Sequence, residues 1–423
     1  MERNYDQLTG LPDMKLFFEY AKEFKKAGPE KTILLFFNLR GMKYFNSNYG
    51  FTEGDKLIAS AGALLCEYFG IKKCSRLGQD HFAAITRCED IKMLIEDIIH
   101  AFMNINGGRT LPVHIGVYVW EGKVDIDAAC DRAKFACDCI KNTAVSTYKI
   151  FTDNMLKLMS DHNYIIEHLD QAINENWITA YYQPIIRAAT GRICDEEALA
   201  RWNDPNRGMI SPAGFVPILE DNNLIYKLDL HIVDLILEKL KIQAETGIPL
   251  VPQCINLSRT DFNACDIVEE IRERVDRSGI GRNKINIEIT ESTIGVNFDF
   301  MKEQIDKLRK LGFSVWIDDF GTGYSSFECL QEIKFDVVKI DMKFIQKYGK
   351  NEQNPIILTE IVKLINGLGM ESVAEGVETK EQLEFLKKIN CTKLQGFYFS
   401  QAMSTDQIFG KWVSGDRIEY ENT

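Results

Sequence analysis

The stretch Ser314-Val-Trp-Ile-Asp-Asp-Phe-Gly321 combines a short apolar strand with two consecutive aspartates and a closing glycine. An amphipathic segment, Phe300–Leu311, precedes this strand and ends near Gly312, as helices often do. A second apolar strand, Val337–Asp341, follows it. Strand, helix and strand in this order are typical of a sheet whose parallel strands are connected by helices.

The same rhythm extends over the second half of the chain. Apolar strand candidates recur at Ile178–Ile186, Cys194–Trp202, Leu250–Ser258, Lys284–Thr290, Ser314–Gly321, Val337–Asp341, Ser372–Val377 and Leu394–Ser400. Eight strands that alternate with helices over about 250 residues predict a (β/α)8 TIM-type barrel.

The first part of the chain has a mixed pattern. Strands are predicted at Ile33–Leu39, Arg76–Thr86, Val113–Val119 and Tyr148–Phe151, and helices at Asp55–Phe69 and Ile126–Asn142. This order predicts a compact α/β domain over residues 1–152. A connecting helix is predicted over residues 153–176, and the barrel domain then covers residues 177–415.

The composition is that of a folded protein. The chain has 423 residues, of which 45% are hydrophobic and 26% are charged, so two or three domains of about 150 residues are expected. Lys and Arg total 50 against 62 Asp and Glu, which gives a formal net charge of -12. Because a net negative surface repels phosphate backbones, we exclude broad binding to DNA or RNA duplexes. A small anionic ligand at a local site stays compatible with this charge.

The cysteines and the first residues bear on the compartment. Eleven cysteines without a framework spacing fit reduced thiols better than disulfides. The start, Met1–Gly10, lacks the apolar core of a signal peptide. No run reaches the roughly 20 apolar residues that a membrane span needs. We therefore expect a cytoplasmic chain with no membrane segment.

Polar side chains gather where the predicted barrel strands end, and barrel enzymes build their sites at that face. They are Glu197, Asn256, Glu288, Glu291, Asp318, Asp319, Lys339, Asp341, Glu375, Glu378 and Gln395. Oxygen ligands without Cys or His suit Mg²⁺ or Mn²⁺ rather than zinc. Two such ions can clamp a phosphodiester for attack by water, and Lys339 adds a cation for that water or for a phosphate oxygen. The alternative, a set of solvated loop carboxylates, does not account for their common phase on separate strands.

These residues lie in ordered motifs. The motifs are Tyr182-Gln-Pro-Ile185, Glu197-Ala-Leu-Ala-Arg-Trp202, Asn256-Leu-Ser258, Glu288-Ile-Thr-Glu291, Asp318-Asp-Phe-Gly-Thr-Gly-Tyr-Ser-Ser326, Val338-Lys-Ile-Asp341, Ala374-Glu-Gly-Val-Glu378 and Gln395-Gly-Phe397. With them, residues from about 160 to 412 resemble the EAL-domain family of cyclic di-GMP phosphodiesterases.

The resemblance implies a two-metal site that holds Mg²⁺ or Mn²⁺ and converts cyclic di-GMP to linear pGpG. The implied metal ligands are Glu197, Asn256, Glu288, Asp318 and Asp319, with Glu375 at the second metal and its water shell. The implied catalytic residues are Lys339, which positions the hydrolytic water, Glu375, and Glu291, which anchors the loop after the fifth strand. The implied substrate contacts are Gln183, Leu199, Arg201 and Gln395. A homodimer is also expected from the family.

The first half resembles the GGDEF (diguanylate cyclase) family in a degenerate form. Asp6-Gln-Leu-Thr-Gly-Leu-Pro12 keeps the opening motif, and Asn46, Gly54 and Asp55 match positions near the nucleotide site. The signature loop, however, is Gly78-Gln-Asp-His-Phe82, in which Gln79 replaces a glycine and His81 a glutamate. Asn38 stands where the family has a metal-binding aspartate, and residues 69–72 lack the Arg-x-x-Asp inhibitory site.

An amide and an imidazole are poor ligands for the Mg²⁺ that accompanies GTP. We therefore expect no diguanylate cyclase activity and a regulatory role for this domain, with GTP as a candidate ligand. Two functions stay open for the whole chain. One is an active cyclic di-GMP phosphodiesterase, and the other is a catalytically silent cyclic di-GMP receptor that signals through a protein partner.

Overall fold

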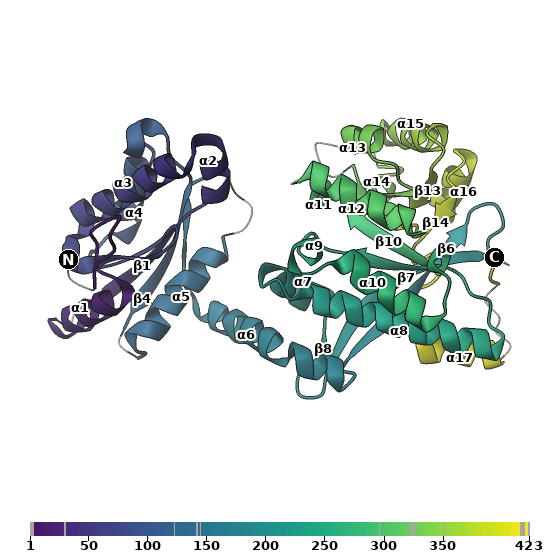
Figure 1. Ribbon diagram of the computed structural model, residues 1–423, viewed down its shortest axis with the longest axis horizontal. Coiled ribbons are helices and arrows are strands. Elements are labelled where there is room, and N and C mark those ends of the chain that lie inside the picture. The colour runs from purple at the N-terminus through teal and green to yellow at the C-terminus, as the bar shows by residue number, and fades with distance from the viewer. Residues whose placement is uncertain are drawn as a thin grey trace. The chain divides into compact units, whose positions relative to one another are not determined.

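The structure is a computed structural model that describes residues 4–28, 31–121, 123–140, 143, 145–295, 297–321, 326–350, 352–414 and 419–421. The chain divides into two compact units, Met1–Asp161 and His162–Thr423 (Figure 1). Helix α6 (Asp153–Asn174) contains the boundary between them, within the segment for which a connecting helix is predicted. None of the described helices is both long and apolar enough to span a bilayer.

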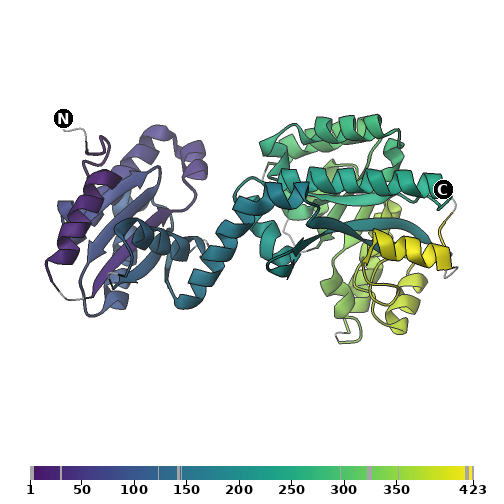
Figure 2. The ribbon, with the colours of Figure 1, turned by 90° about the horizontal axis from the view of Figure 1, so that it is seen from below.

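The first unit is a five-stranded sheet with helices on both faces (Figure 2). Its elements are α1 (Met14–Lys26), β1 (Thr32–Leu39), α2 (Met42–Tyr49), α3 (Phe51–Phe69), β2 (Cys74–Gly78), β3 (His81–Thr86), α4 (Ile91–Phe102), β4 (Val113–Trp120), α5 (Ile126–Asp138) and β5 (Thr147–Ile150). The strand order is β2-β3-β1-β4-β5. The α/β domain is thus confirmed, but the single strand predicted over Arg76–Thr86 is wrong, because Gln79 and Asp80 form a turn between two antiparallel strands.

The central strand β1 explains why this sheet is covered on both faces. Successive strand side chains point to opposite faces, so an entirely apolar strand buries both. Leu35 and Phe37 pack in one core with side chains of α3 and α4. Leu34 and Phe36 pack in a second core with side chains of α1 and α5. The sheet therefore lies between two helical layers.

The second unit is a closed barrel. Its eight strands are β6 (Ile178–Arg187), β7 (Ile193–Asp204), β9 (Gln253–Leu257), β10 (Ile285–Thr290), β11 (Ser314–Phe320), β12 (Val337–Ile340), β13 (Glu371–Ala374) and β14 (Lys393–Leu394). They pair in this order, and β6 closes the barrel by pairing with both β7 and β14. Two short strands, β8 (Gly208–Ile210) and β15 (Met403–Ser404), extend β7 and β6 at the rim. A barrel strand lies at each of the eight predicted places, but β14 shares only Leu394 with the predicted Leu394–Ser400, whose other residues form a turn and irregular chain.

One strand departs from the regular (β/α)8 pattern. Neighbours from β7 to β14 are parallel, whereas β6 is antiparallel to both of its neighbours. The segment between β6 and β7 is only a short turn that contains Gly191 with a positive φ of 73°. A parallel crossover needs about a dozen residues, so β6 and β7 can only form a hairpin.

Helices cover the outside of this barrel (Figures 1 and 2). They are α7 (Pro212–Asp221), α8 (Ile225–Thr246), α9 (Asp261–Ala264), α10 (Ile267–Ser278), α11 (Glu291–Gly295), α12 (Phe298–Lys310), α13 (Ser326–Glu332), α14 (Met342–Gln346), α15 (Asn354–Gly367), α16 (Lys380–Lys388) and α17 (Thr405–Ser414). Their apolar faces form one large core with the strands. Because the strands from β7 to β14 run parallel, their carboxyl ends meet at one mouth.

Candidate active site

Lys339 of β12 lies at the centre of this mouth and is 1% exposed. Its Nζ is 2.7 Å from Glu375 Oε1 and 2.8 Å from Glu288 Oε2. Asp318 Oδ1 and Glu197 Oε2 lie at 3.3 and 3.4 Å. Burial alone would lower the pKa of Lys339, but these four carboxyl groups raise it well above its usual range. The ammonium therefore stays charged and holds together carboxyl groups that would otherwise repel one another.

Neutral amides fix the carboxylate of Glu197. Asn256 Nδ2 donates to its Oε1 at 3.0 Å, and Gln395 Nε2 donates to its Oε2 at 2.7 Å. The register explains the first contact, because Glu197 of β7 lies opposite Cys254 of β9, two residues before Asn256. Burial raises the pKa of Glu197, but Lys339, Gln395 and Asn256 together hold it below the usual range. Glu197 is thus a buried carboxylate, ionised and held in one orientation.

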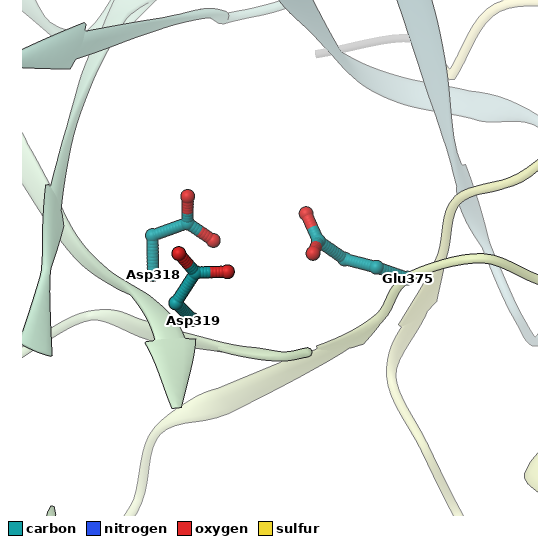
Figure 3. Close-up of side chains that lie close together, drawn as sticks. All are labelled: Asp318, Asp319 and Glu375. Carbon is teal, nitrogen blue, oxygen red and sulfur yellow. The ribbon is translucent and has the colours of Figure 1, made fainter. Parts of the chain in front are cut away.

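A β-bulge brings Asp318 and Asp319 to the same mouth. Side chains of adjacent strand residues normally point to opposite faces. The register between β11 and β12 shifts from Ile317 to Phe320, and Asp319 has a positive φ of 55°. Figure 3 shows that both aspartates point toward Glu375, and ligand oxygens of the three lie within 4.8 Å of one another. The irregular backbone therefore builds a three-carboxylate group, as bulges beside active sites often do.

A glycine allows the chain to turn immediately after the bulge. Gly321 has a φ of 95°, and a Cβ there would lie 2.7 Å from the ring of Phe344. The backbone N–H of Gly321 donates to Glu291 Oε2 at 3.1 Å, and Glu291 is buried. This is the contact that an anchor of the loop after the fifth strand needs, although the role itself stays a prediction. Residues 322–325 of that predicted loop lie outside the described residues.

The mouth holds more carboxyl groups than the single charge of Lys339 can balance, so several of them bind a proton more tightly than usual. Burial raises the pKa of Glu288 well above its usual range, and that of Glu375 to about 8, although Lys339 opposes both shifts. Burial and the neighbouring Asp318 and Asp341 raise the pKa of Asp319 to about 6. Glu288 Oε1 is buried without a hydrogen-bond partner among the described residues. An excess of carboxyl oxygens, one of them unpaired, fits divalent cations that prefer oxygen ligands.

The predicted substrate residues are only partly joined to this cluster. Gln395 Nε2 lies 3.4 Å from Gln183 Oε1, so Gln183 reaches the carboxylates through Gln395. Leu199 and Arg201 lie further along β7, where the Arg201 guanidinium donates to the carbonyl of Ala200 and lies 5.5 Å from the ring centroid of Tyr181. The predicted metal ligands and Lys339 therefore form one cluster in the structure. Leu199 and Arg201 lie further along β7, outside that cluster.

One residue near the cluster had been given no role by the sequence. Asp341 is buried at the end of β12, and its carboxyl group forms a side-chain hydrogen bond with that of Asp319. Its Oδ1 also accepts the backbone N–H of Lys343 and caps α14. A carboxylate directly after an apolar strand was the available signal, but an ordinary helix cap gives the same pattern.

Each of the two units matches a different known family. Residues 166–402 match the family described as EAL domain, which is more than half of the chain. The chain belongs to the EAL-domain family. Residues 3–146 match the family described as Diguanylate cyclase, GGDEF domain, so a GGDEF domain precedes the EAL domain. The site residues Glu197, Asn256, Glu288, Asp318 and Lys339 all lie within the EAL match.

Curated relatives share the two-domain region. The chain is 27% identical to the cyclic di-GMP phosphodiesterase NbdA of Pseudomonas aeruginosa, over 94% of this chain and 52% of NbdA. It is 27% identical to the bifunctional diguanylate cyclase/cyclic di-GMP phosphodiesterase MucR of the same species, over 96% of this chain and 61% of MucR. The chain thus spans between half and two thirds of the length of these relatives.

Solved structures support the fold. The PaMucR phosphodiesterase in complex with c-di-GMP is 32% identical, with a TM-score of 0.55, and the match covers 58% of this chain and 99% of that one. The S helix-GGDEF-EAL structure of Vibrio cholerae LapD has a TM-score of 0.60 over 93% of this chain and 95% of that one. At 18% identity, the LapD structure supports the fold alone.

In the GGDEF domain, the residues that differ from the family's motifs lie on two neighbouring strands and in an adjacent turn. Asn38 of β1 and His81 of β3 are direct partners in the antiparallel register, so the two replaced positions face each other on neighbouring strands. Gln79, which replaces a glycine, has a positive φ of 47° in the turn between β2 and β3. At the positions that match the family's nucleotide site, a Cβ on Gly54 would lie 2.0 Å from Asn46 Oδ1, so α2 and α3 approach closely there.

Proposed function

We propose that this chain hydrolyses cyclic di-GMP to the linear dinucleotide pGpG, with Mg²⁺ or Mn²⁺ as its cofactor. The observation that carries the proposal is the buried Lys339 inside a ring of carboxyl groups that outnumber it, at the mouth of an EAL barrel. The names of NbdA and MucR add support, because both include cyclic di-GMP phosphodiesterase.

The residues that would hold two cations are those with oxygen atoms directed into the mouth. They are Glu197, Asn256, Glu288, Asp318, Asp319 and Glu375. When bound there, divalent cations would supply polarisation of the phosphodiester and a water nucleophile at neutral pH. Every residue of this set offers oxygen, as Mg²⁺ and Mn²⁺ prefer.

The chain's own residues orient and complement that chemistry. Lys339 keeps its positive charge at the centre, where it would hold the attacking water or a phosphate oxygen. Asn256 and Gln395 keep Glu197 in one orientation, and Glu291 holds the backbone beyond the bulge. Gln183, Leu199 and Arg201 would contact the dinucleotide. Preorganised charges of this kind cost no rearrangement during the reaction.

The GGDEF domain would regulate the barrel rather than make cyclic di-GMP. Asn38 and His81 offer no carboxylate at the positions where the family binds Mg²⁺. Asn46 and Asp55 still match the family's residues near its nucleotide site. GTP is therefore the proposed regulatory ligand. We place the chain in the cytoplasm, where its free cysteines would stay reduced, and expect a homodimer by resemblance to the family.

The test is an assay of the purified chain with cyclic di-GMP and Mg²⁺ or Mn²⁺, followed by chromatography of the products. We expect pGpG in the presence of either metal and none after chelation. A titration with GTP in the same assay tests regulation. Tight binding of cyclic di-GMP without any pGpG would contradict the proposal and favour the receptor function.

A further inference from the structure

Two carboxyl groups, one of a buried and one of a half-buried residue, lie near the turn that follows β9. Asp261, the first residue of α9, is fully buried, and its Oδ2 accepts the backbone N–H of Ser258 at 2.7 Å. Its Oδ1 accepts no N–H or O–H from the described residues. The carboxyl group of Asp229, on α8, lies within hydrogen-bonding distance of the Asp261 side chain. The buried side chain of Asp261 and the half-buried side chain of Asp229 therefore meet between two helices.

Two touching carboxyl groups share a proton more readily than they both ionise. Burial raises the pKa of Asp229 well above its usual range, and the charge of Asp261 raises it further. Burial also raises the pKa of Asp261 to about 6, against the lowering effect of Asp229 and the N–H of Ser258. Glu220 of α7 is the third charged group that acts on the pair, and it raises both pKa values.

We propose that Asp229 and Asp261 share one proton and that this protonated pair positions the turn after β9, and with it Asn256. Ser258, which Asp261 holds, lies two residues beyond Asn256, and its Oγ donates to Glu220 Oε1 at 2.6 Å. The turn is thus held from both α7 and α9. The inference rests on the proposed function only in taking Asn256 as a metal ligand.

The contacts give this positioning a path to the site. Asn256 Nδ2 donates to Glu197 Oε1, so a shift of the turn would move the amide that orients Glu197. Loss of the shared proton would place two negative charges in contact inside the protein, and their repulsion would separate α8 from the short α9. Groups that hydrogen-bond directly to a metal ligand change metal affinity by about 10- to 100-fold when they are removed, and Asp261, which acts through Ser258, should lie at the lower end of this range.

The sign of the pH dependence follows from raised pKa values. A group that binds its proton more tightly in the folded state stabilises the fold fully below its unfolded pKa, which is about 3.9 for Asp. This stabilisation decreases as the pH rises through the folded-state values, of which Asp261 is at about 6 and Asp229 is higher. The pair therefore weakens the fold progressively above about pH 4.

The first test replaces the shared proton by a permanent donor. In Asp229→Asn, the amide N–H can donate to Asp261 at every pH, so we expect a melting temperature a few degrees above wild type at pH 8 and a smaller difference at pH 5. Asp261→Asn should behave alike, because its oxygen still accepts from Ser258 while its N–H donates to Asp229. The matched control is Asp234→Asn on the same helix, an exposed carboxylate 3.4 Å from Arg274, which should lack this trend.

The second test uses Mn²⁺ alone as the probe of Asn256. Asp261→Ala removes the acceptor of the Ser258 N–H, so we expect about tenfold weaker Mn²⁺ binding by calorimetry, with near-normal binding in Asp229→Asn. Equal pH dependence in wild type and both Asn variants, or unchanged Mn²⁺ binding in Asp261→Ala, would overturn the inference. If these shifts appear in a wild type that forms no pGpG, the inference stands and the proposed function fails.

Discussion

The barrel mouth of the EAL domain and the β1–β3 pair of the GGDEF domain are the two places where the family resemblances imply bound Mg²⁺. At the barrel mouth, four carboxyl groups lie within 3.4 Å of Lys339, and one buried oxygen of Glu288 has no hydrogen-bond partner among the described residues. At β1–β3, the amide of Asn38 faces the imidazole of His81. One site has more carboxyl groups than its single lysine can balance, and the other has an amide and an imidazole.

The difference between the two sites lies in whether the folded protein needs a cation there. A buried cluster of carboxylates is costly in the folded state unless cations balance it, so a bound divalent cation would stabilise the barrel mouth. The β1–β3 pair carries no such cost, because neither Asn38 nor His81 is a carboxylate. The fold of the GGDEF domain therefore does not depend on a cation between Asn38 and His81.

Replacement of Glu197 at the barrel mouth should have the strongest effect on activity. Glu197→Gln keeps the shape of the side chain but removes the negative charge that Asn256 and Gln395 orient. We expect a loss of at least about 100-fold in the rate of pGpG formation and a matching loss of Mn²⁺ affinity. Chromatography of the products and calorimetry with Mn²⁺ measure the two.

The control for this variant is Glu332→Gln, which alters an exposed glutamate 3.0 Å from Lys302 on the outside of the barrel. It should leave both rate and metal affinity near wild type, because exposed ion pairs contribute little. A Glu197→Gln enzyme with the wild-type rate would show that the ring of carboxyl groups is not the reactive centre.

A smaller effect is expected where the backbone leaves the bulge. Glu291→Ala removes the acceptor of the Gly321 N–H and should lower the rate about tenfold, because the adjacent Asp318 and Asp319 lose part of their support. Glu291→Gln is the matched variant, since its side-chain oxygen can still accept this hydrogen bond. Kinetics at saturating substrate should rank wild type, Gln and Ala in that order. Equal rates for the Ala and Gln variants would argue against a role for this hydrogen bond.

The barrel could be predicted from the sequence because its strands are apolar and each ends in a polar group. Asp318 and Asp319 after an apolar run, and Lys339 inside another, have few structural explanations other than a shared site. The pattern of polar residues at strand ends therefore predicts the residues that meet at the mouth. The family resemblance then supplied roles that spacing alone does not contain.

Other features could not be predicted, because they depend on pairing in three dimensions. The antiparallel direction of β6 follows from the short turn near Gly191. The pattern of apolar strands predicts where strands lie but not in which direction they run. The bulge at Asp319 requires a left-handed backbone that aspartate adopts only occasionally. Asp229 lies on an amphipathic helix, where a polar residue usually indicates a solvated face, so its contact with Asp261 gave no sequence signal.

Restoring carboxylates between β1 and β3 of the GGDEF domain should have a weaker effect. The double variant Asn38→Asp, His81→Glu places two carboxylates opposite each other on β1 and β3, as a hard cation requires. Its affinity for GTP in Mg²⁺ should rise about fivefold over wild type, and the gain should vanish on chelation, because without a cation the two charges repel. Gln79→Glu is the control, since it adds a carboxylate in the neighbouring turn and not opposite Asn38. Calorimetry with GTP measures the affinities, and synthesis of cyclic di-GMP from GTP by the wild-type chain would contradict the contrast between the two sites.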